Sequence, residues 1–83
     1  MSKDELLMKI ANAAIEYRRA QAAVNFHNNE HHKQFGRFWR RDENAQMNHK
    51  DVVVPARVAV KNAKRVLDGY LFMYDVKQWA VSE

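Results

Sequence analysis

The residues best suited to chemistry lie near the middle of the 83-residue chain. The stretch HNNEH places His27 and His31 four residues apart, with Glu30 between them. On a helix, this spacing brings both imidazoles to one face, where they can bind zinc while the carboxylate acts as a base. A zinc ion that activates a water molecule is therefore the first chemistry to weigh against the rest of the sequence.

The rest of the sequence gives the zinc hypothesis little support. The H-x-x-E-H order matches that of inverted zinc metalloproteases, but a chain of this length is too short to build their substrate cleft. Asn28 and Asn29 weaken a helix at this point. Glu43 and His49 are only nominal third ligands. We therefore expect no metal ion and no other cofactor, and we interpret the histidines as polar surface residues.

No other set of residues is typical of a catalytic site. The two serines, Ser2 and Ser82, lie near the two ends of the sequence, which argues against a serine nucleophile. The two glycines, Gly36 and Gly69, cannot form a glycine-rich phosphate loop, and there is no cysteine for thiolate chemistry. We expect the protein not to be an enzyme.

The stretch FGRFWRR, residues 35–41, combines three aromatic residues with three arginines. Both kinds of residue are enriched where proteins bind partners, because they offer large contact area together with stacking or directional hydrogen bonds. The candidate partner-binding residues are Arg37, Phe38, Trp39, Arg40 and Arg41, with Tyr74 and Trp79 as a second surface. Two alternatives stay open: the aromatic rings close the end of a hairpin, or they stack on nucleic-acid bases.

A group of basic residues follows on the last predicted helix and is called the basic ridge below. It consists of Arg57, Lys61, Lys64 and Arg65. Their spacing is suited to contacting successive phosphates of a nucleic acid. Asp68, however, lies four residues after Lys64, so that a solvated face with ion pairs explains the pattern equally well.

Composition points to one folded domain, residues 1–83, in which hydrophobic residues make up 47% and the net charge is +4. The charge permits nucleic-acid binding without requiring it. No apolar run approaches the roughly 18 residues of a membrane-spanning helix. The first ten residues lack the features of a signal peptide. We expect a cytoplasmic protein with no membrane partner.

The first element is predicted to be a helix over about residues 3–30. Ser2 is its expected N-cap, and Glu5 completes a capping box. The apolar residues cover well over half of the circumference, more than one neighbouring helix needs. They are Leu6, Leu7, Met8, Ile10, Ala11, Ala14, Ile15, Tyr17, Ala22, Val24 and Phe26. We expect more than one element to pack against this helix.

A polar, partly helical connection follows over about residues 31–51, in which Asp42 is suited to cap a short helix. The last predicted helix covers about residues 55–80, and Pro55 fits its first turn. Its expected buried seam has a spacing of three and four residues. The seam residues are Ala56, Ala59, Ala63, Val66, Tyr70 and Met73. Gly69 is expected to mark a bend or a tight contact.

The sequence thus predicts an all-α fold: a helical hairpin of two long antiparallel helices. Two helices leave much apolar surface uncovered, which favours dimerisation into a four-helix bundle or docking on another protein. Our first functional hypothesis is a non-enzymatic protein that docks on a larger protein and modulates or inhibits it, as a small inhibitor of viral or plasmid origin would. The alternative is a small basic dimer that binds nucleic acid through the basic ridge. A third hypothesis is a structural subunit that only assembles with itself.

Overall fold

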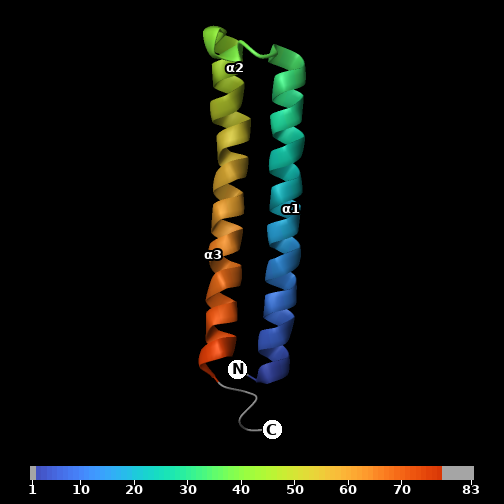
Figure 1. Cartoon of the computed structure of the whole chain (residues 1–83), viewed down its shortest axis with the longest axis vertical. Helices are drawn as coiled ribbons and strands as arrows, with labels where there is room; N and C mark the ends of the chain where they lie inside the picture. Colours follow the sequence, from blue (N-terminus) through green and yellow to red (C-terminus); the bar gives the residue numbers. More distant parts are fainter. Residues whose placement is uncertain (1, 78–83) are drawn as a thin grey trace.

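A computed structural model describes residues 2–77, and it shows two long antiparallel helices joined at one end by short helical turns (Figure 1). In chain order, the elements are α1 (Lys3–Phe35), a 3-10 turn η1 (Trp39–Arg41), α2 (Glu43–Asn48), a π-helical turn η2 (His49–Val53) and α3 (Val54–Val76). The end that carries η1, α2 and η2 is called the tip below. The predicted all-α hairpin is confirmed.

Different interactions determine where α1 begins and where it ends. At its start, Ser2 Oγ accepts a hydrogen bond of 3.1 Å from the Glu5 backbone N–H, which confirms the predicted cap. The sequence predicted an end near residue 30, yet the helix continues to Phe35 and stops at Gly36, whose φ is +77°. His31 and Phe35 pack together there, with ring centres 5.1 Å apart. This packing offsets the weak helix propensity of the asparagines before it.

The stretch from α2 to α3 is helical throughout but widens at η2. Asp42 caps α2 as predicted, because its side chain accepts from the Asn44 N–H at 2.9 Å. In η2, the Val54 N–H donates to the carbonyl of His49, five residues back instead of four. Pro55 explains the wide turn: it has no N–H, and its ring would clash with the carbonyl of residue 51 in a regular α-helix.

α1 packs against α3, η2 and α2, which follow one another along the same side of it (Figure 1). The half-buried residues of α3 keep the alternating spacing of a coiled-coil seam. They include Ala56, Val60, Ala63, Leu67, Tyr70 and Tyr74. The predicted seam was partly wrong, since Ala59 and Val66 are exposed and Val60 and Leu67 take their places. Both series alternate steps of three and four residues, but the observed one begins with a step of four from Ala56, which moves every second position by one residue around the helix.

Within residues 2–77, only a few side chains are buried. The buried residues are Leu6, Ala13, Ala45, Val53 and His31. Three of these five, Ala45, Val53 and His31, lie at the tip or directly beneath it. The tip is therefore the most tightly enclosed part of the hairpin.

The hairpin is a rod of 59 × 16 × 15 Å with a radius of gyration of 18.2 Å. A compact domain of this length would have a radius of gyration of about 12 Å. The accessible surface is 6593 Å², against roughly 5,200 Å² for a compact protein of the same mass. Among residues 2–77, no helix combines the length and apolar character that crossing a membrane requires.

Candidate functional site

The side chains of the predicted FGRFWRR site point in two directions, some toward solvent and some toward the interior of the hairpin. Phe38 points outward with 70% of its surface exposed, and the Arg41 guanidinium lies 5.7 Å from its ring centre. Arg37 is exposed beside it. Trp39 is half-buried, and Arg40 lies over its ring at 5.5 Å. The outer surface of the tip therefore belongs to Phe38, Arg37 and Arg41, while Trp39 faces the interior.

Trp39 belongs to an aromatic cluster that ties three elements together. It stacks on His49 with ring centres 4.6 Å apart and an interplanar angle of 24°. It meets His31 edge-on at 4.7 Å and 80°. Aromatic rings favour both arrangements. The expectation that the aromatics close the end of the hairpin therefore holds for Trp39 but not for Phe38.

His31 is not the surface histidine that the sequence predicted. It is only 1% exposed, because it lies at the end of α1 directly under the tip. Its Nδ1 atom lies 2.8 Å from the side-chain nitrogen of Asn48. An amide nitrogen can only donate, so Nδ1 accepts and the ring proton sits on Nε2. The Nε2 atom is buried and has no hydrogen-bond partner among the described residues.

The environment of the two inner histidines favours their neutral form. Burial lowers the pKa of His31, and the nearby His49 and His32 lower it further. Burial also lowers the pKa of His49, with additional effects from Arg57, Arg40 and His32. Both rings are therefore neutral near pH 7, and the positive charge around them resides on the two arginines.

A cavity of about 190 Å³ opens beside this cluster and is called the tip cavity below. It is lined by Asn28, His31, His32, Trp39, Arg40, His49 and Arg57. None of these residues is acidic. Sequence reasoning missed this site because its residues lie on four elements that only the hairpin turn brings together. The available signal was the concentration of histidine and arginine around a single tryptophan.

The four residues of the basic ridge are all exposed on α3. In the part of the chain that the structure describes, none of them forms an ion pair with a carboxylate, whereas Arg19 and Glu16 do so at 3.1 Å. The ion pair that seemed available to Lys64 and Asp68 does not form. The ridge is therefore an open positive surface, continuous with the tip cavity through Arg57.

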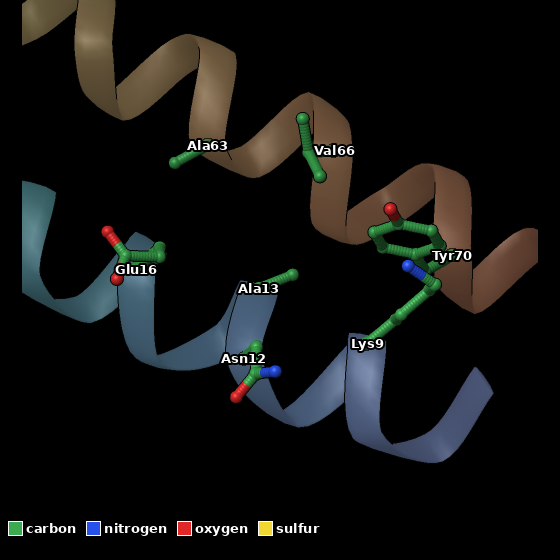
Figure 2. A pocket seen from close by; sticks show the side chains of 7 residues that line it. All are labelled: Lys9, Asn12, Ala13, Glu16, Ala63, Val66 and Tyr70. Carbon is green, nitrogen blue, oxygen red and sulfur yellow. The ribbon is translucent and has the colours of Figure 1, made fainter. Parts of the chain in front are cut away.

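A second cavity, of about 380 Å³, lies between α1 and α3 far from the tip. Figure 2 shows its lining residues: Lys9, Asn12, Ala13, Glu16, Ala63, Val66 and Tyr70. Ala13 and Ala63 point into the gap between the helices, and their short side chains leave it hollow (Figure 2). Lys9 extends toward the Tyr70 ring. The result is an open groove to which α1 contributes three polar residues besides Ala13, while α3 contributes Ala63, Val66 and the ring of Tyr70.

The predicted second binding surface is only partly described. Tyr74 is half-buried in the last turns of α3, and Trp79 lies outside the described residues. Within residues 2–77, no three His, Asp or Glu side chains gather in an arrangement that could hold a metal ion. In comparison with known proteins, the chain matches no family model, no curated protein and no solved structure.

Proposed function

We propose that the chain is a non-enzymatic interaction protein that docks on a larger protein and modulates it, with the outer surface of the tip as anchor. The observation that carries this proposal is the balance of apolar side chains. Among the described residues, twelve large apolar side chains are exposed, whereas four apolar residues are buried. Scattered exposed apolar residues are ordinary, but such a majority is typical of a surface that a partner covers.

The amount of surface supports the same function. The accessible surface of 6593 Å² exceeds that of a compact protein of this mass by about 1,400 Å². A stable interface of standard size covers about 800 Å² on each partner. The hairpin therefore has enough additional surface for an interface while keeping its own helices packed.

The tip indicates the chemistry of the partner. Phe38 presents an apolar ring at the end of the rod, and Arg37 and Arg41 are exposed around it. A pocket that accepts the ring and carries carboxylates at its rim complements this arrangement, since arginine pairs with carboxylates in a bidentate manner. The net charge of +4 also accelerates encounter with an acidic surface.

Phe38→Ala tests this proposal, with Phe26→Ala as the matched control. Phe26 is exposed to 61%, close to the 70% of Phe38, but it lies on α1 away from the outer tip. Tagged proteins are incubated with native lysate, treated with nuclease and washed in physiological salt. We expect the wild type and Phe26→Ala to retain one protein in equal molar amount. Phe38→Ala should lose it at unchanged helicity, because a buried aromatic anchor contributes about 2 kcal/mol or more to binding.

Equal retention by Phe38→Ala would contradict the anchor role, and retention of nothing by the wild type would contradict the docking function. Trp39 is unsuitable for this test, although the sequence alone suggested it. Its ring packs on His31 and His49, so that its removal would disturb the fold of the tip as well as any interface.

The alternative function, nucleic-acid binding, is favoured by one specific observation: the four cations of the basic ridge have no carboxylate partners within the described residues. If all four contact phosphates of a duplex, the logarithm of the affinity should fall with the logarithm of salt concentration with a slope of about −3.6. A slope near zero would exclude this function. In the lysate experiment, nucleic-acid binding would appear as bound material that is lost when the sample is treated with nuclease.

A further inference from the structure

We propose that the tip cavity is a binding site for a single tetrahedral oxyanion, in the cell a phosphate group. It is held between the guanidinium groups of Arg40 and Arg57, in a cavity that His31 and His49 also line. This inference goes beyond the docking function and does not depend on it. It rests on the side chains that α1, η1, η2 and α3 bring to one cavity.

The two arginines supply positive charge from two separate elements. Arg40 lies on η1, where the Trp39 ring beneath its guanidinium restricts its position. Arg57 is the fourth residue of α3. Arginine binds phosphate through paired N–H donors, and no acidic residue lines the cavity to compete for them. The same two charges repel a metal cation.

His31 forms part of the cavity wall without offering the cavity a donor. Its Nδ1 accepts from Asn48, so the proton lies on Nε2, and that buried N–H has no acceptor among the described residues. Buried donors are nearly always paired in folded proteins. The Nε2 atom has no accessible surface, however, so a ligand in the cavity does not reach it, and the donors open to an oxyanion are those of Arg40, Arg57 and the other lining side chains.

The cavity has suitable size and neighbours for a phosphate group. Its volume of about 190 Å³ is many times the roughly 10–15 Å³ that one water molecule requires. The Asn28 amide and the rings of His32 and His49 also line it and can donate hydrogen bonds. An oxyanion would therefore meet donors from α1, η1, η2 and α3.

A titration followed by NMR of the histidine rings tests the site on the full chain. Inorganic phosphate is added at constant ionic strength, with chloride as the comparison anion. We expect a saturable shift of the His31 and His49 resonances with phosphate and none with chloride. His27, which does not line the cavity, should not follow them.

Arg57→Ala should weaken phosphate binding at least about tenfold, because it removes a charge-assisted contact. Arg65→Ala, which removes an exposed arginine of the same helix outside the cavity, should leave the affinity unchanged. Both arginines are exposed, so both variants should keep the helicity of the wild type. A second arm uses a nucleoside monophosphate: tighter binding than inorganic phosphate assigns the group to a phosphate ester, and weaker binding assigns it to the free ion. The proposal is overturned if chloride gives the same shifts, if neither phosphate compound shifts His31 and His49, or if both variants bind like the wild type.

Discussion

His31 joins α1 to the tip through a hydrogen bond to Asn48 and ring contacts with Trp39 and His49. The sequence showed this residue only as part of a zinc-like pattern. Residue type and spacing say which atoms are able to donate or bind, but burial depends on what the chain places opposite. For His31, those opposing groups are 8 to 18 residues away in the sequence, beyond the reach of local reasoning.

We predict that the tip loses stability as the pH falls. Burial, together with nearby histidine and arginine side chains, lowers the pKa of His31 and His49 in the folded state, so the unfolded state binds more protons below the ordinary histidine pKa of 6.5. The stabilising effect of the neutral rings is therefore fully present above that pKa and is lost as the pH falls through the lowered values. Arg57, Arg40 and His32 oppose the protonation of His49, and His49 and His32 oppose that of His31.

The measurement is urea unfolding, followed by circular dichroism, between about pH 7.5 and pH 5. We expect the free energy of unfolding to decrease across this range, and His49→Gln to reduce the decrease. A free energy of unfolding that is constant or rises toward pH 5 would show that these histidines do not control the stability of the tip.

At the scale of the helices, the sequence predicted the starts better than the ends. Ser2 and Asp42 act as caps because their hydrogen bonds are local and follow from residue type. The wide turn at His49–Val53 was not predicted, since Pro55 indicates a helix start without showing that the chain is already helical before it. α1 extends beyond Asn29 for a similar reason: packing under the tip outweighs propensity.

The two glycines allow a paired test of this local structure. Gly36 has φ +77° and ψ −169°, a conformation nearly restricted to glycine, so Gly36→Ala should destabilise the protein by about 1–3 kcal/mol. Gly69 lies within α3, and a Cβ added there would meet no atom within 4 Å. The tight contact expected from the sequence is absent. Gly69→Ala should stabilise the helix by up to about 1 kcal/mol.

Thermal and urea unfolding of the two variants measure both effects, with opposite signs expected. The strain at residue 36 arises from the backbone alone, because open space surrounds that position as well. Equal effects of the two substitutions would mean that the chain does not turn at Gly36 as described.

For the molecule as a whole, the sequence predicted the hairpin and the large apolar surface that two helices leave exposed. Both helices carry exposed apolar residues, such as Ile15 on α1 and Phe72 on α3, exposed to 49% and 67%. The seam uses one side of each helix, so the remaining apolar residues have no partner within the hairpin. Neither periodicity nor composition distinguishes a larger protein from a second copy as the partner.

Ile15→Ser and Phe72→Ser distinguish these two partners. If a larger protein covers the hairpin, each substitution should reduce the binding of an apolar dye. It should also change the free energy of unfolding by less than about 0.5 kcal/mol, as is usual at exposed sites. If two hairpins form a bundle, the same variants should halve the mass measured by analytical ultracentrifugation and lower stability in a concentration-dependent manner. If the wild type is monomeric and both variants bind the dye as strongly as it does, neither a larger protein nor a second copy is supported as the partner.

The antiparallel arrangement also fixes how far the hairpin reaches. α1 begins and α3 ends at the same end of the rod (Figure 1), and the 33 residues of α1 span about 50 Å. A group attached at that base therefore lies about the length of the rod away from the tip. A dye or an affinity handle at the base would therefore leave the tip unobstructed, and two hairpins joined base to base would place their tips at most about 100 Å apart.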